Sequence, residues 1–85
     1  MKSKVLNYAV ILQKEPEGGY TVTVPALSGC VTYGGNVEEA KKMAVEAIEL
    51  YIESLEAHNE KIPEDSETFY TQVSVTPSFS HAEAP

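Results

Sequence analysis

The feature that most constrains this chain is a set of apolar residues that recurs every three or four positions between residues 40 and 55. The set is Ala40, Met43, Ala44, Ala47, Ile48, Tyr51, Ile52 and Leu55. This spacing predicts an amphipathic helix of about five to six turns whose apolar stripe must lie against another element. Asn36 and Glu39 fit a capping box at its start, and His58, Lys61 and Pro63 mark its end.

Three short strands are predicted before the helix. Residues 6–14 alternate, with Leu6, Tyr8, Val10 and Leu12 on one face. Ala9 and Ile11 make the other face apolar too, which favours a central strand covered on both sides. A hairpin loop at residues 15–19 leads to a second strand, residues 20–24, and a third strand runs from Cys30 to Tyr33.

A fourth strand is predicted after the helix, from Thr68 to Thr76, although its alternation is weaker. We therefore expect one α+β domain over residues 1–76 in the order β-β-β-α-β. Its parts are an antiparallel three-stranded meander, one packed helix and a C-terminal strand. Residues 77–85 contain too little apolar surface to be ordered alone, and we expect a disordered tail there.

The charge balance argues against a nucleic-acid-binding role. Thirteen acidic residues against six lysines give a net charge of −7, and the chain has no arginine. Such a chain lacks the basic surface that attracts phosphates. A single cysteine, Cys30, fits a reducing compartment, and no segment has the roughly 18 apolar residues of a membrane span. We expect a cytoplasmic protein.

The sequence offers few residues that could carry out catalysis. A two-metal nuclease needs several converging carboxylates, mostly aspartates, and Asp65 is the only aspartate. One Cys and two distant His do not form a zinc site. Cys30 could be imagined as a nucleophile activated by His58 or His81, but a buried structural cysteine is the favoured interpretation. We predict no catalytic, metal or cofactor site.

Two stretches of the sequence resemble the HicB antitoxin family. The first runs from Gly18-Gly19-Tyr20 through Val24-Pro25 to Leu27-Ser28-Gly29-Cys30, and the second is Val37-Glu38-Glu39-Ala40 with the alanine-rich helix. Ser28 and Asn36 stand where the family usually has proline and threonine or serine. The resemblance implies a partial ribonuclease-H-like fold without catalytic carboxylates, and a partner, the small basic mRNA-cleaving HicA toxin. The operator-binding segment of many members has no counterpart among the nine residues after Thr76.

With this resemblance, the chain is predicted to be the antitoxin of a HicA/HicB-like system that occludes its toxin. An acidic band is predicted on the helix face opposite the apolar stripe, formed by Glu39, Glu46, Glu49, Glu53, Glu56 and Glu60. Its candidate toxin-binding residues are Glu46, Glu49, Glu53 and Glu56. A solvated face that keeps the protein soluble explains the same pattern equally well. The alternative function is an orphan HicB-like interaction module that binds another protein or a ligand.

Homo-oligomerisation is a further expectation. The core is small for an independent domain, and a terminal strand without a neighbour favours pairing between copies. The candidate contact residues lie on the predicted fourth strand: Phe69, Tyr70, Val73 and Val75. We expect a homodimer or a higher homo-oligomer.

Overall fold

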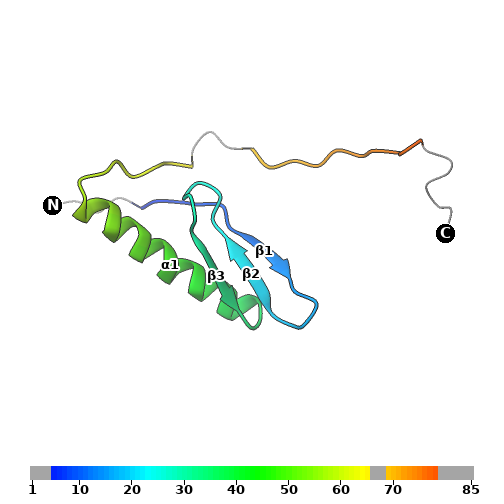
Figure 1. Cartoon of the computed structure of the whole chain (residues 1–85), viewed down its shortest axis with the longest axis horizontal. Coiled ribbons are helices and arrows are strands. Elements are labelled where there is room, and N and C mark those ends of the chain that lie inside the picture. Colours follow the sequence, from blue (N-terminus) through cyan, green and yellow to red (C-terminus); the bar gives the residue numbers. More distant parts are fainter. Residues whose placement is uncertain (1–4, 66–68, 79–85) are drawn as a thin grey trace.

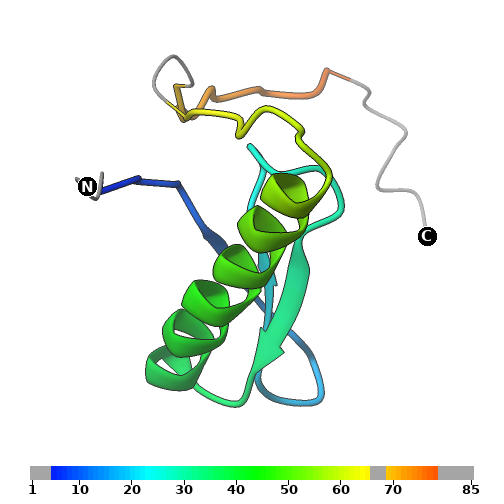
Figure 2. The same cartoon turned by 90° about the vertical axis from the view of Figure 1, so that its left-hand side faces the viewer.

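The computed structural model describes residues 5–65 and 69–78. Three strands precede one helix: β1 (Ile11–Lys14), β2 (Tyr20–Thr23), β3 (Val31–Gly34) and α1 (Val37–Ala57) (Figure 1). The strands form one antiparallel sheet in the order β1-β2-β3, and α1 lies across one of its faces (Figure 2). The predicted α+β class, the meander and the packed helix are confirmed.

The prediction that the first strand is central is wrong for this single chain. In the described sheet β2 lies in the middle, and β1 pairs only with β2, in a register that sets Leu12 opposite Val22. On the sheet face away from α1, Ile11 is 44% exposed. Apolar residues on both faces of a strand therefore did not fix its place in the sheet.

The core lies between the sheet and α1, in two adjoining clusters. Val22 packs with Ala40 and Ala44, and the second cluster comprises Val24, Leu27 and Cys30. Small side chains on the helix let it approach the sheet closely. At the end of β3, a Cβ on Gly34 would lie only 2.4 Å from the Cα of Ala40.

Both ends of α1 are capped by neighbouring polar groups. At the start, the Asn36 side chain accepts a hydrogen bond from the Glu39 amide at 2.8 Å, and the Glu39 carboxylate accepts one from the Gly35 amide at 2.6 Å. At the end, Glu60 N–H donates to Leu55 O and Asn59 N–H donates to Glu56 O. Asn59 has a φ of 57°, so this is a Schellman motif with asparagine in the left-handed position.

The chain after α1 returns to the start of the sheet. The Tyr8 hydroxyl donates to Pro63 O at 2.6 Å, and the Ala9 amide donates to the Asp65 carboxylate at 2.7 Å. Residues 69–78 then form an extended segment that is neither helix nor strand, so the predicted fourth strand is not confirmed. Thr68 and residues 79–85 of the predicted tail lie outside the described residues.

Candidate functional site

Four glutamates of the predicted acidic band lie on the solvent-facing side of α1. Glu46, Glu49, Glu53 and Glu56 are all exposed. Their spacing of three, four and three residues places them on one face of the helix. The exposed side chain of Leu50 lies among them, and with three of the glutamates it lines a shallow hollow of about 380 Å³. Negative charge and one apolar side chain are thus presented together.

Two glutamates of the predicted acidic band, Glu39 and Glu60, do not belong to this face. The carboxylate of Glu39 is held at the N-terminus of α1 by its hydrogen bond to Gly35. Glu60 follows the helix, where its amide completes the C-terminal cap. The four exposed glutamates Glu46, Glu49, Glu53 and Glu56 therefore form one stripe along α1, which we call the acidic face.

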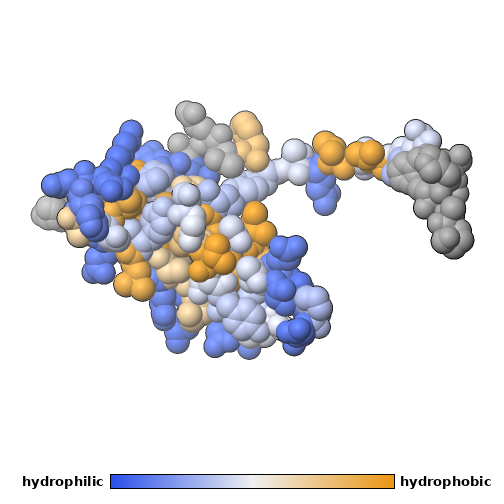
Figure 3. Space-filling model, in the orientation of Figure 1, coloured by the Kyte–Doolittle hydropathy of each residue, from blue (hydrophilic) through white to orange (hydrophobic). Residues whose placement is uncertain are grey.

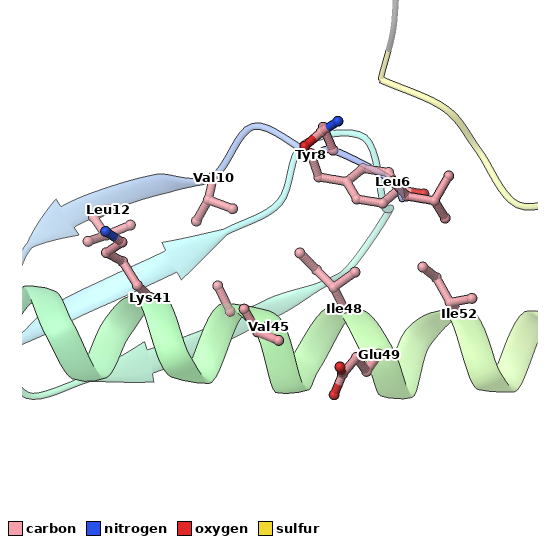
Figure 4. A pocket seen from close by; sticks show the side chains of 11 residues that line it. Leu6, Tyr8, Val10, Leu12, Lys41, Val45, Ile48, Glu49 and Ile52 are labelled. Atoms are coloured by element: carbon pink, nitrogen blue, oxygen red, sulfur yellow. The ribbon is translucent and has the colours of Figure 1, made fainter. Parts of the chain in front are cut away.

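An open groove separates the N-terminal strand region from α1. Its two walls are apolar, and Figure 4 shows side chains of both pointing toward one another. The groove measures about 750 Å³ and is lined mainly by Leu6, Tyr8, Val10, Leu12, Ala44, Val45, Ile48 and Ile52, with Lys41 and Glu49 also contributing. Sequence periodicity assigned most of these residues to the core and did not reveal that one side of it stays open.

Cys30 is a structural residue. It is buried beside Val24 and Leu27. Burial raises the pKa of its thiol, which lowers the thiolate fraction near neutral pH and makes the group a poor nucleophile. His58, the residue considered as an activator of Cys30, lies at the C-terminus of α1. Its ring nitrogen Nδ1 is 2.8 Å from Ser54 O.

The tyrosines near the core are held by hydrogen bonds to the backbone. The Tyr51 hydroxyl donates to Ser28 O at 2.7 Å, which ties α1 to the loop between β2 and β3. Burial, and then the charges of Glu64 and Asp65, raise the pKa of Tyr8. These contacts make Tyr8 and Tyr51 packing residues, as the sequence predicts.

Residues 5–65 and 69–78 contain neither a metal-binding cluster nor a membrane-spanning helix. In this part of the chain, the His, Cys, Asp and Glu side chains form no group of three or more that could hold a metal ion. Over the same residues, α1 is not apolar enough along its length to cross a bilayer.

The family is decided by comparison with known proteins. Residues 8–82 match the model of the HicB-like antitoxin of bacterial toxin–antitoxin systems. The chain belongs to the HicB-like antitoxin family. The match covers all of the described sheet and helix of this HicB-like chain, and it confirms the family indicated by the Gly18–Cys30 and Val37–Ala40 motifs.

Individual relatives agree with this assignment. The UPF0150 protein Ta0767 of Thermoplasma acidophilum is 52% identical over 61 residues, which are 72% of this HicB-like chain and 88% of the relative. The UPF0150 protein ssr1765 of Synechocystis is 47% identical over 73% of this chain and 78% of the relative. Antitoxin HicB 1 of Photorhabdus laumondii is 40% identical over 71% of this chain but only 39% of its own length.

The predicted oligomer contacts lie together on the extended segment. Phe69, Tyr70, Val73 and Val75 are all exposed there, and Figure 3 shows apolar side chains standing clear of the domain at the right of the view. The structure therefore separates two candidate surfaces: the acidic face on α1 and the apolar residues of this segment.

Proposed function

We propose that this chain is the antitoxin of a HicA/HicB-like type II system. In this proposal it binds a small, basic, mRNA-cleaving HicA-like toxin and neutralises it by covering the surface that mRNA must reach. Membership of the HicB-like antitoxin family supports a toxin as the partner. The proposed mode of binding rests on one observation: the chain, whose net charge is −7, exposes an acidic face formed by Glu46, Glu49, Glu53 and Glu56.

Charge complementarity explains why such a face suits such a partner. A protein that binds RNA needs a positively charged surface, and a row of carboxylates competes with phosphates for that surface. Opposite fields accelerate encounter and disfavour wrong partners more than they add affinity. The residual affinity needs buried apolar contact, and Leu50 lies among the glutamates in position to supply it.

The proposal requires binding alone. In occlusion one antitoxin surface covers one toxin, so the fraction of toxin that is inhibited equals the fraction bound in the complex. We keep the partial ribonuclease-H-like fold implied by the family resemblance, with action in the cytoplasm and without direct nucleic-acid contact. The chain contains no arginine, and it carries one buried cysteine, Cys30.

The test is coexpression of the full chain with the basic protein encoded beside it. Growth arrest by that protein should be relieved, and the two proteins should copurify. The double variant Glu49→Lys with Glu53→Lys reverses two charges in the centre of the acidic face. We expect it to slow association at low salt by about tenfold or more, and to have a much smaller effect at high salt.

The matched control reverses two exposed glutamates elsewhere, Glu17→Lys with Glu60→Lys. Each double variant adds four charges to the wild-type value of −7, which gives −3 in both cases. A general effect of net charge would slow both variants equally. Equal association rates for the wild type and the Glu49/Glu53 variant would show that the acidic face only keeps the protein soluble.

A further inference from the structure

The chain that follows the C-terminal cap of α1 forms a strap between the helix and the sheet. We use this name for residues 61–65, which run from the end of the helix back to the residues just before β1 (Figure 1). Two hydrogen bonds hold the strap there. The Tyr8 hydroxyl donates to Pro63 O at 2.6 Å. The Ala9 amide donates to the Oδ2 atom of Asp65 at 2.7 Å.

Asp65 supplies an acceptor that the sheet does not provide at this point. In the register of β1 and β2, Ile11 pairs with Thr23, so Ala9 would stand opposite Pro25 two residues further on. By then β2 has ended, and Pro25 lies in the turn that leads away from the strand. A backbone amide needs a partner when it is withdrawn from water. The Asp65 carboxylate therefore takes the place of the missing strand.

The contact made by Asp65 is incomplete. While its Oδ2 atom accepts the bond from Ala9, its Oδ1 atom is buried and has no hydrogen-bond partner within the described residues. A carboxylate gains from each bond that it accepts, and it loses from each oxygen that leaves water without one. Opening the strap breaks two bonds but returns Oδ1 to water. This gain narrows the free-energy gap between the closed and the open forms of the strap.

The strap can leave without disturbing the core. The described members of the two core clusters, and the side chains packed on them, come from residues 8–51. The Schellman motif at Asn59 and Glu60 completes the helix before the strap begins. Within the strap, Ile62 and Pro63 are only half-buried. A segment with few buried contacts beyond a completed cap belongs to the part of a domain that opens locally while the rest stays folded.

Opening matters for the groove because the strap joins its two walls at one end. One wall is formed by residues 6–12, and Tyr8 both lines the groove and donates to the strap. The other wall is α1, whose end leads into the strap. At this end Leu6 and Tyr8 stand across the groove from Ile52 (Figure 4). With the strap open, the first wall loses both bonds that tie it to the chain after α1.

We propose that the strap opens and closes as one unit, hinging after the cap at Asn59, and gates the adjoining end of the groove. Tyr8 and Asp65 are the positioning residues of the closed form. They act together because both contacts lie on one short piece of chain. The open form keeps the sheet, α1 and the core. The strap belongs to this chain alone, so its opening holds or fails independently of the toxin and of the proposed function.

The test is amide hydrogen exchange of the full chain, followed residue by residue with NMR at one protein concentration. Two amides report on two kinds of opening: Ala9, which donates to the strap, and Val24, a core residue that donates to Cys30 O. Ala9 should be protected, and low urea should leave its exchange rate unchanged. Val24 should exchange more slowly, and its rate should rise steeply with urea, because global unfolding exposes far more surface than opening of the strap.

Tyr8→Phe tests whether the two contacts open together. It removes the hydroxyl bond to Pro63 and leaves the bond of the Ala9 amide in place. If the strap moves as one unit, the Ala9 amide should exchange about fivefold faster, which is the effect of losing one hydrogen bond. The matched control Tyr51→Phe removes a hydroxyl that donates to the loop between β2 and β3 at 2.7 Å, and it should leave Ala9 exchange unchanged.

Asp65→Ala tests the gate. Its Ala9 amide should exchange at close to the rate of an unprotected amide, because the acceptor is gone. The methyl signals of Leu6, on the wall that the strap releases, should move toward their positions in an unfolded chain. Those of Leu27, a residue of the same type in the core, should stay where they are. Circular dichroism confirms that each variant is folded.

Four results would overturn the proposal. An unprotected Ala9 amide in the wild type would show that the strap is not closed. Equal rates and equal urea dependence for Ala9 and Val24 would show that the strap leaves only when the whole domain unfolds. An Ala9 rate that Tyr8→Phe leaves unchanged would show two contacts that act separately. Leu6 signals that Asp65→Ala leaves in place would show that the strap does not gate the groove.

Discussion

Gly34 offers a sharp test of how closely α1 approaches the sheet. It is the last residue of β3 and is buried against the first turns of the helix. An added Cβ would lie 2.4 Å from both the Cα and the N of Ala40, and 2.9 Å from its Cβ. These atoms belong to the helix backbone or adjoin it and cannot rotate away, so Gly34→Ala must push α1 from β3.

The cost follows from two opposing terms. Overpacking a core by one methyl group costs about 1–3 kcal/mol. Restricting the unfolded chain by replacing glycine with alanine returns about 0.4–1 kcal/mol. We expect a net loss of about 1–2 kcal/mol, which lowers the urea midpoint by about 1 M for a denaturant slope of about 1.5 kcal/mol/M.

Gly35→Ala is the matched control because it makes the same chemical change one residue later. Its added Cβ meets only the Glu39 Oε1 atom, at 2.9 Å, at the end of a flexible side chain. Neither glycine has a positive φ, so backbone strain does not separate them. Urea unfolding followed by circular dichroism at one protein concentration measures both. Equal midpoints for the two variants would refute the close-packing argument.

Two further predictions concern single hydrogen-bonding groups. Asn36→Ala should destabilise the fold by about 1 kcal/mol in urea unfolding, whereas Asn36→Asp should keep the cap, because aspartate accepts the same bond from the Glu39 amide. Tyr8 has a folded pKa above its ordinary value of 10.0, so the folded chain holds the phenol proton more tightly. That contribution to stability is complete below about pH 10 and is lost as pH rises through the folded pKa. The stability difference between wild type and Tyr8→Phe should therefore shrink above pH 10 in unfolding measured from pH 8 to 11. A constant difference would count against the raised pKa.

The helix and the hairpin could be predicted from the sequence because their determinants are local. The three-to-four-residue periodicity and the Asn36 cap set α1, which the structure places at Val37–Ala57. The turn before β2 contains Gly18 and Gly19, which have φ values of 108° and 80°. Side-chain spacing and backbone preference act within a few residues, so they can be identified before the chain folds.

The site was predictable only in part. The exposure of the acidic face follows from helix periodicity, because residues opposite an apolar stripe face solvent. The groove did not follow, because its walls come from residues 6–12 and from α1, which are far apart in the chain. The exposed positions of Val45 and Leu50 likewise depend on which side of α1 the sheet covers.

The sequence by itself determined the helix, the strands of the meander, the family and the negative charge, since each depends on residue identity and short-range spacing. Only the tertiary structure decided that β1 lies at the edge of the sheet and that the core is open beside it. Strand order and the closure of a core depend on contacts between distant segments. Alternation of side chains fixes the two faces of a strand, but its neighbours are chosen by the whole fold.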